Sequence, residues 1–280
     1  MTGAPSLARR PSAYVLTIGV SRYGDSSYDL NYAAKDALET AETLKQNLPF
    51  AQDIIHVKTL PNERATRSNI LASLRELSLR VQPEDTVIVS YSGHGILHKG
   101  HFYLIPHDLG KTGDESDLAR HGIKDSDLEP IFLNLSAQQT ALILDACHSG
   151  QALESDEWRR GPMNSRGLIQ LAWEKGMEVL AASQSRQAAL EAWQIGGRQI
   201  GHGLLTYALI KEAFTSSPRR DGRLLAKDWL DFAVSRVPHL LGQKDVKEKA
   251  IRLGSPGASP VQTPRVFHRR EGGGDWAVGK

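Results

Sequence analysis

Cysteine is almost absent from this chain: its 280 residues include one, Cys147. A single cysteine excludes an intramolecular disulfide, and it also excludes a structural zinc site built from several thiolates. A lone thiol persists as a thiol in a reducing compartment. We therefore expect a cytoplasmic protein.

Long apolar runs and an excess of charge of one sign are missing as well. The most apolar stretches, such as Thr86–Tyr91 and Ala141–Leu144, are much too short to span a bilayer. The residues after Arg9 and Arg10 do not form the pattern of a signal peptide. The formal net charge is only +2, which gives no electrostatic reason to expect nucleic acid or a membrane as a partner.

Several short apolar runs are present, and they have the character of buried strands. Each is rich in Val, Ile or Leu on both faces, which is typical of parallel strands covered on both sides. The runs are Ala13–Val20, Ile54–Leu60, Thr86–Tyr91, Thr140–Asp145 and Met177–Ala182. Helical patterns lie between them, so the sequence predicts an α/β fold with a mostly parallel sheet and helices on both faces.

Three helix starts can be predicted from capping residues. Asn31 is a candidate N-cap for a helix that ends near Leu48, and Thr66 is one for the next helix. Ser126 followed by Glu129 has the spacing of a capping box. Two later helices are expected at His202–Phe214 and Ala226–Val237. Irregular chain is expected at Lys111–Lys124, at Gln151–Gly167, and from Gly254 onward.

Two glycine-flanked motifs follow predicted strands directly. Ser92-Gly93-His94-Gly95 comes after the third strand, and Asp145-Ala146-Cys147-His148-Ser149-Gly150 comes after the fourth. In parallel sheets, sites form beyond the carboxyl ends of the strands. A thiolate is a good nucleophile, and a nearby His can accept and return its proton. The motifs therefore predict a Cys–His dyad, with His94 as general base and Cys147 as nucleophile.

These paired motifs resemble those of the caspase superfamily, most closely its metacaspase and prokaryotic orthocaspase branch. Asp145 and His148 have the metacaspase identities, where animal caspases carry Gln and Arg or a similar residue. Weaker similarities occur in Leu30–Ala37, Ala182–Ser185 and Gly203–Thr206, and the resemblance runs from about Ala13 to about Phe214.

The resemblance implies a fold, a division of the chain, and roles for individual residues. The fold is a caspase-like three-layer sandwich. The peptidase domain covers 13–253, with a large-subunit-like part to about 150, a linker at 151–167 and a small-subunit-like part from about 168; tails cover 1–12 and 254–280. The backbone N–H groups of Gly95 and Cys147 form the oxyanion hole. Asp145, Asp36 and Ser183 bind the substrate, and the two carboxylates favour Arg, and also Lys, before the scissile bond.

Control of the activity is expected in the linker 151–167. It holds three arginines, Arg159, Arg160 and Arg166, which match the enzyme's own predicted specificity. Cleavage there is expected to activate the enzyme, and the sequence leaves open whether the enzyme itself, an upstream protease or a ligand such as calcium triggers it. The family analogy alone connects such regulated proteolysis with programmed cell death or antiviral defence.

Other interpretations are weaker but stay open. His94, His98, His101 and His107 do not have the spacing of a catalytic metal site, so we expect no metal and no cofactor. The acidic residues Asp114, Glu115, Asp117, Asp125 and Asp127 could bind calcium, but they lack the EF-hand pattern.

The chain could also be a pseudoprotease that acts as a binding module, or a relative of separase-like or CHAT proteases. The substrates are expected to be proteins or peptides.

Overall fold

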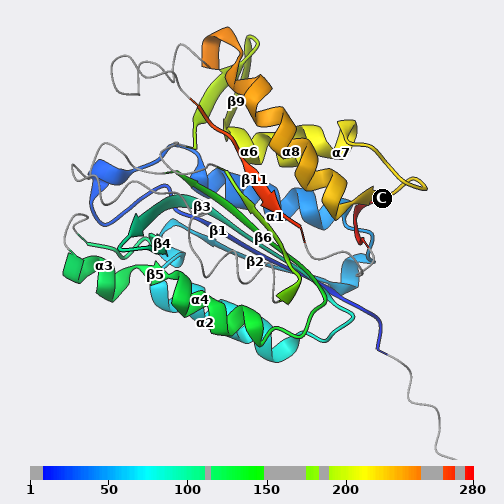
Figure 1. Cartoon of the computed structure of the whole chain (residues 1–280), viewed down its shortest axis with the longest axis horizontal. Helices are drawn as coiled ribbons and strands as arrows, with labels where there is room; N and C mark the ends of the chain where they lie inside the picture. The colour runs from blue at the N-terminus through cyan, green and yellow to red at the C-terminus, as the bar shows by residue number, and fades with distance from the viewer. Residues whose placement is uncertain (1–8, 111–114, 148–174, 183–188, 247–260, 269–274) are drawn as a thin grey trace, which may run out of the picture.

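The computed structural model describes residues 9–110, 115–147, 175–182, 189–246, 261–268 and 275–280. For Leu97 and Cys147 it describes the backbone alone. The predicted α/β architecture is confirmed: a mostly parallel sheet lies between two layers of helices (Figure 1).

Six strands form the body of the central sheet, in the order β11-β7-β6-β3-β1-β2. Neighbouring strands are parallel except for β11, which is antiparallel to β7. Two short strands, β4 and β5, extend the sheet from the end of β3. The strands are β1 (Ala13–Gly19), β2 (Ile55–Pro61), β3 (Thr86–His98), β4 (His101–Leu104), β5 (Ile123–Lys124), β6 (Gln139–Cys147), β7 (Glu178–Ala181) and β11 (Arg265–Phe267).

All five predicted strands are present, and two are longer than expected. β3 continues through His94 to His98, and β6 continues to Cys147. The sequence indicated the ends of both strands near Tyr91 and Asp145, because Ser92, Gly93 and His94 have little strand character. The extension arises from pairing, since β3 pairs with β6 as far as His94 and with β4 from Gly95 to His98.

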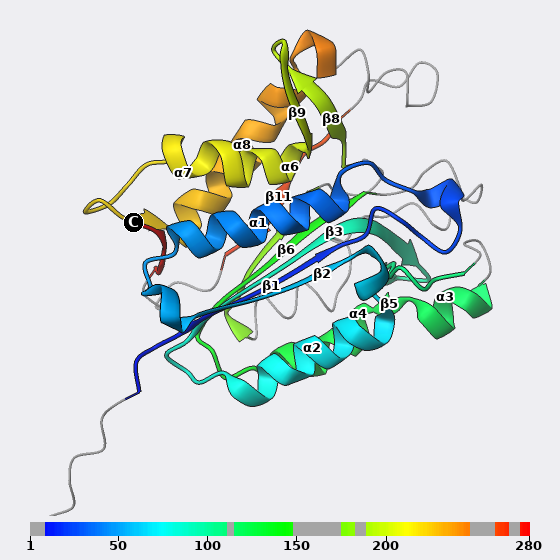
Figure 2. The same cartoon turned by 180° about the vertical axis from the view of Figure 1, so that it is seen from behind.

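The helices cover both faces of the sheet (Figures 1 and 2). α1, α6, α7 and α8 lie on one face, and α2, α3 and α4 lie on the other. Their bounds are α1 (Ala33–Asn47), α2 (Arg67–Arg80), α3 (Glu115–His121), α4 (Asp125–Leu133), α6 (Leu204–Tyr207), α7 (Ala213–Ser216) and α8 (Ala226–Leu241). A π-helical turn, η6 (Ala208–Glu212), joins α6 to α7, and short 3-10 turns are η1 (Ser26–Tyr28), η2 (Gln52–Ile54) and η3 (Asn62–Arg64).

Side chains of β1 alternate between two hydrophobic cores because successive residues of a strand point to opposite faces. Leu16 and Ile18 belong to the core under α2 and α4. Ala13 and Val15 belong to the core under α1 and α8, which also contains Trp229. The sheet is therefore buried on both sides, as its continuous apolar strands predicted.

One of the three predicted helix caps is confirmed. Thr66 Oγ1 accepts a hydrogen bond from the backbone N–H of Asn69 at 3.2 Å. Asn31 is not the cap of α1, because its backbone and side-chain N–H groups donate instead to the Glu191 carboxylate. Ser126 is inside the first turn of α4, and the Asp127 carboxylate accepts the backbone N–H of Lys124 there.

The chain after Gly254 departs most from expectation. It was predicted to be a tail of loop or extended chain, but β11 pairs with β7 in the central sheet. Further on, β12 (Ala277–Gly279) pairs with β10 (Leu224–Leu225), and Trp276 and Val278 are buried. These residues are part of the same folded unit, and their strands are too short to show a pattern in sequence. The segment Lys111–Lys124, expected to be irregular, contains α3 and β5.

Candidate active site

The two sequence motifs meet at the carboxyl ends of adjacent parallel strands. His94 on β3 and Cys147 on β6 are register partners, and so are Ser92 and Asp145. Paired strands lie about 4.8 Å apart. The backbones of the predicted base and the predicted nucleophile are therefore neighbours across one strand spacing.

His94 is buried, and two tyrosines fix its position. Its ring lies 4.9 Å from the Tyr23 ring, and its backbone N–H donates to the Tyr23 hydroxyl at 2.8 Å. Its Nε2 lies 2.7 Å from the carbonyl oxygen of Tyr28. A carbonyl only accepts hydrogen bonds, so Nε2 carries the proton in the neutral ring. Nδ1 then has the lone pair that a general base requires.

Gly95 is packed too closely to accept any side chain. A Cβ there would lie 2.5 Å from Cζ of Phe102 and 3.1 Å from Cβ of Ala146. The absence of a side chain lets β3 pass directly beside β6 at the level of His94. The role of the Gly95 N–H in an oxyanion hole stays a prediction.

Asp36 and Asp145, far apart in sequence, line one small pocket. Asp36 comes from α1 and Asp145 from the end of β6, and both are buried. Gly203, at the end of β9 (Arg198–Gly203), lies between them: a Cβ there would be 2.8 Å from Oδ2 of Asp145 and 3.1 Å from Oδ2 of Asp36. The pocket has a volume of about 10 Å³ and is lined by Leu30, Ala33, Asp36, Ser92, Gly93, Asp145, Leu190, Glu191 and Gly203.

Hydrogen bonds hold both carboxyl groups in place. Oδ2 of Asp145 accepts the hydroxyl of Thr206 at 2.6 Å and its backbone N–H at 3.2 Å. Oδ2 of Asp36 accepts the N–H of Gly203 at 2.9 Å, and Oδ1 lies 2.6 Å from Nδ1 of His202. In the part of the chain that the structure describes, no hydrogen bond reaches Oδ1 of Asp145.

Burial raises the proton affinity of both groups. Burial and the neighbouring Asp36 carboxyl raise the pKa of Asp145 to about 7, although its bonds from Thr206 oppose the shift. Burial likewise raises the pKa of Asp36 well above its ordinary value, against the effect of the Gly203 N–H. Two buried carboxyls side by side form a site whose negative charge a cationic ligand would stabilise.

Sequence reasoning missed three residues around these carboxyls. Thr206 was noticed only as part of the Gly203–Thr206 similarity, and nothing in the sequence connected it with Asp145. Glu191, on β8 (Glu191–Ile195), lines the pocket and accepts hydrogen bonds from the backbone N–H groups of Asn31 and Tyr32. His202 was predicted to begin a helix, but it lies in strand β9, one residue before the end of that strand.

Four predicted residues lie outside the described residues: Ser183 and the linker arginines Arg159, Arg160 and Arg166. The predicted substrate-binding role of Ser183 and the activation cleavage at the arginines therefore stay predictions.

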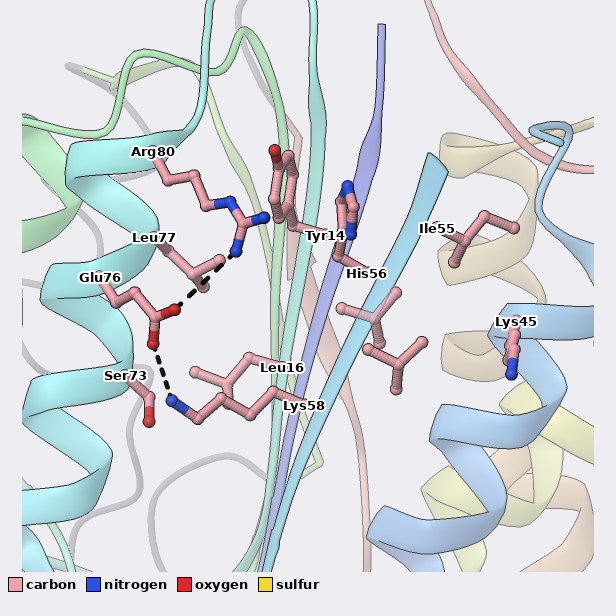
Figure 3. Close-up of a pocket in the computed structure, with 12 residues that line it drawn as sticks. Tyr14, Leu16, Lys45, Ile55, His56, Lys58, Ser73, Glu76, Leu77 and Arg80 are labelled. Carbon is pink, nitrogen blue, oxygen red and sulfur yellow. Dashed lines mark hydrogen bonds and ion pairs between the residues drawn. The ribbon is translucent and has the colours of Figure 1, made fainter. Parts of the chain in front are cut away.

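A larger cavity of about 570 Å³ lies elsewhere, at the free edge of β2 (Figure 3). It lies between α2 on one side and α1 on the other, and Lys58 and Arg80 there pair with Glu76. None of the four residues His94, Cys147, Asp36 and Asp145 lines it. This cavity is larger than the acidic pocket, but it is not the candidate active site. His94 and Cys147 lie at the opposite, carboxyl ends of the strands.

Of the acidic residues considered for calcium, Asp114 lies outside the described residues, and the other four have protein partners. Glu115 pairs with Lys99, and Asp127 pairs with Arg67 at 3.0 Å. Asp125 accepts from Nδ1 of His101 and the backbone N–H of Phe102. Within the described ranges, no three His, Cys, Asp or Glu side chains converge in a way that could hold a metal ion.

The arrangement defines a class of protein: a three-layer α/β sandwich with a His and a Cys at the carboxyl ends of adjacent parallel strands. The particular family follows from the sequence profile described as "Caspase domain", which matches residues 12–228. The chain belongs to this family of cysteine peptidases.

Relatives agree with this assignment. The chain is 29% identical over 148 residues to Metacaspase-1 of Plasmodium falciparum, a match that covers 50% of this chain and 24% of the relative. It is 30% identical over 185 residues to Metacaspase-1 of Schizosaccharomyces pombe, covering 61% of this chain and 41% of the relative. These matches span less than half the length of either relative.

Solved structures show the same fold. The crystal structure of protein GSU0716 from Geobacter sulfurreducens is similar with a TM-score of 0.57 at 15% identity, and the match covers 92% of this chain and 94% of that one.

In the described part of the chain, no helix combines the length and the apolar character needed to cross a membrane.

Proposed function

We propose that this protein is a cysteine endopeptidase that cleaves peptide bonds after Arg, and also after Lys. The observation that carries the proposal is the register of β3 and β6, which places His94 beside Cys147 and Ser92 beside Asp145. The pair His94–Cys147 is thereby only two positions along the strands from Asp145, which lines the acidic pocket.

The chemistry follows from these groups. His94 Nδ1 accepts the thiol proton of Cys147, and the thiolate attacks the carbonyl carbon of the residue in the pocket. Backbone N–H groups at Gly95 and Cys147 stabilise the oxyanion. The His94 imidazolium then protonates the leaving amine, and water hydrolyses the acyl-enzyme with His94 as base again. We place this reaction in the cytoplasm because it needs a reduced thiol.

The specificity rests on Asp36 and Asp145. A guanidinium entering the pocket meets two carboxyls, and its planar fork can form paired charge-assisted hydrogen bonds with a carboxylate. An ammonium can use the same charge with a single donor group. A P1 Asp would add a third carboxyl to two buried ones, which is unfavourable.

The test is peptide hydrolysis by the purified protein with fluorogenic substrates that carry Arg, Lys or Asp at P1. We expect activity on Arg and Lys peptides, none on Asp peptides, and loss of all activity in Cys147→Ala and in His94→Ala. Asp145→Asn should lower kcat/KM on Arg peptides about 10- to 100-fold, since a hydrogen bond to a charged group contributes about 1.5–3 kcal/mol.

His239→Ala is the control, because His239 is exposed on α8 and far along the chain from the site. Hydrolysis that persists in Cys147→Ala would disprove the dyad, and faster cleavage after Asp than after Arg would disprove the pocket assignment. Cys147 is the single cysteine, so labelling by a thiol reagent also reports on this residue alone. A protein that labels but hydrolyses nothing would be the binding module instead.

We further propose that cleavage within 151–167 activates the enzyme. The support is the sequence: the segment follows the nucleophile motif and holds Arg159, Arg160 and Arg166. Replacing the three arginines with Ala should prevent the cut and delay the onset of activity, as followed by gel and by peptide hydrolysis. If activation is unchanged and no cut maps between Cys147 and Met177 in the parent protein, this segment is not the switch.

A further inference from the structure

His202 contacts Asp36, one of the two carboxyl groups that line the acidic pocket. Its side chain is 3% exposed, and its Nδ1 lies 2.6 Å from Oδ1 of Asp36. The next residue, Gly203, donates its N–H to the other oxygen of Asp36 at 2.9 Å. Two consecutive residues of β9 therefore hold both oxygens of one carboxyl, which fixes the plane of that carboxyl toward the pocket.

The far side of the imidazole faces a second carboxylate. Nε2 of His202 lies 3.3 Å from Oε2 of Glu39, which is on α1 less than one turn after Asp36. Glu39 is partly exposed and also pairs with Lys211. A ring between two carboxyls can donate to both only as an imidazolium; a neutral ring accepts from one and donates to the other.

The charges around His202 decide where the proton between it and Asp36 resides. Lys35 on α1 lies 3.5 Å from Glu39 and donates to the carbonyl oxygens of Ile200 and Gly201. The pair is also near Asp145 on β6, Glu191 on β8, whose charge raises the pKa of Asp36, and the Tyr207 ring of α6, 6.3 Å from the His202 ring. Burial lowers the pKa of His202 to about 4, and burial raises that of Asp36. Both shifts favour a neutral ring beside a protonated Asp36 in the empty pocket.

We propose that His202 is a positioning residue for P1 recognition that takes the carboxyl proton of Asp36 when a cationic P1 side chain enters the pocket. The inference rests on the proposed specificity for basic residues. In this step the O–H bond at Asp36 breaks and an N–H bond forms at Nδ1 of His202. The new imidazolium charge faces Glu39 through Nε2–H, and the Asp36 carboxylate faces the substrate.

The proton count of binding follows from this transfer. Below about pH 7, Asp145 is protonated in the empty pocket and must release its proton to water when a guanidinium binds. Asp36 need not do so, because its proton moves to His202. The parent protein should thus release about one proton per bound peptide, whereas a variant without the acceptor should release about two.

The experiment is titration calorimetry on the Cys147→Ala protein, which binds without cleaving, at about pH 6 in two buffers of different ionisation enthalpy. The ligand is a short peptide ending in Arg amide, and its neutral isostere ending in citrulline is the control ligand. His202→Asn keeps an N–H for Asp36 but cannot take up a proton. We expect about one additional proton released, and binding weakened at least about tenfold at pH 6, with the difference shrinking toward pH 9.

Two further variants support the interpretation. Glu39→Gln removes the partly exposed counter-charge of the imidazolium, so it should shift the proton count in the same direction by a smaller amount. His239→Asn changes an exposed histidine of α8 and should leave the proton count and the affinity unchanged.

The outcomes separate the two proposals. If the parent protein binds the Arg and citrulline peptides equally, the proposed basic specificity is wrong. If it prefers Arg but His202→Asn releases the same number of protons as the parent, only the role of His202 is wrong. A loss of affinity in His202→Asn that is the same at pH 6 and pH 9 would show a structural effect alone and would also overturn the inference.

Discussion

Asp145 is the residue whose protonation should set the pH dependence of the enzyme. Its pKa of about 7, raised by burial and by Asp36, means that the pocket gains negative charge as the pH rises through neutrality. Recognition of Arg is therefore expected to strengthen with rising pH and to weaken as the pH falls below about 7. The hydroxyl of Thr206, 2.6 Å from Oδ2, opposes the shift because it stabilises the carboxylate.

Thr206→Val is expected to move this dependence to higher pH. The substitution keeps the shape of the side chain and the backbone N–H bond but removes the hydroxyl donor, so the pKa of Asp145 should rise further. The acid side of the kcat/KM profile for an Arg peptide should shift upward in pH, with little change on the alkaline plateau. Thr215→Val is the matched control, since Thr215 is exposed and bonds only within its own helical region. An unshifted profile would contradict the assignment of the acid side to Asp145.

At the scale of elements, His268, directly after β11, connects that edge strand to β7 and α8 by hydrogen bonds. His268 lies 2.7 Å from the Glu178 carboxylate on β7 and 2.8 Å from Asp231 on α8. Burial lowers the pKa of His268, but the hydrogen bonds with these two carboxylates outweigh it and the pKa is raised. The protonated ring thus stabilises the folded state.

The stabilisation by His268 should be lost as the pH rises. Because the folded pKa is raised, the contribution is fully present below the unfolded value of about 6.5 and is lost as the pH rises through the folded pKa. The Tm of the parent should fall more steeply than that of His268→Gln between about pH 6 and pH 9, as measured by thermal unfolding. His239→Gln on α8 is the control. Parallel curves for the parent and His268→Gln would mean that the bridge contributes nothing to stability.

The segment that carries β12 is a second element with a large effect on stability. Trp276 is 3% exposed and packs in the core shared with α8, and its carbonyl oxygen accepts the N–H of Ala226 at the start of that helix. Trp276→Ala should lower the free energy of unfolding by about 3–5 kcal/mol, because it leaves a large cavity. Trp193→Ala, at a side chain 51% exposed on β8, should cost much less in the same urea titration. Equal losses would contradict the packed position of the segment.

At the scale of the whole molecule, the strands β2, β1, β3, β6 and β7 of the central sheet could be predicted from sequence, whereas the edge strand β11 and the separate strand β12 could not. Long apolar runs such as β1 leave few alternatives to buried parallel strands. β11 and β12 are three residues each beside Gly- and Pro-rich chain, so only their pairing with β7 and β10 makes them strands. The same holds for β3 beyond Tyr91, where pairing first with β6 and then with β4 continues the strand to His98.

Part of the candidate site could likewise be predicted from the sequence, and part could not. The adjacency of His94 and Cys147 could be expected because both motifs follow parallel strands. The pairing of Asp36 with Asp145 depended on the family resemblance, since residues 109 positions apart show no local relationship. His202 and Glu191 could not be found, because β8 and β9 bring them to the pocket only through tertiary contacts with α1.

Residues on both sides of the segment between Cys147 and Met177 form the acidic pocket. Asp36 and Asp145 come before it, and His202, Gly203 and Thr206 come after it. β6 and β7 remain hydrogen-bonded to each other across this interval. If the protein were produced as two polypeptides divided there, neither alone would contain a complete pocket, and reassembly of the sheet would restore it. Under the proposed specificity for basic residues, binding of an arginine peptide would then report that two proteins fused to the two polypeptides have come together.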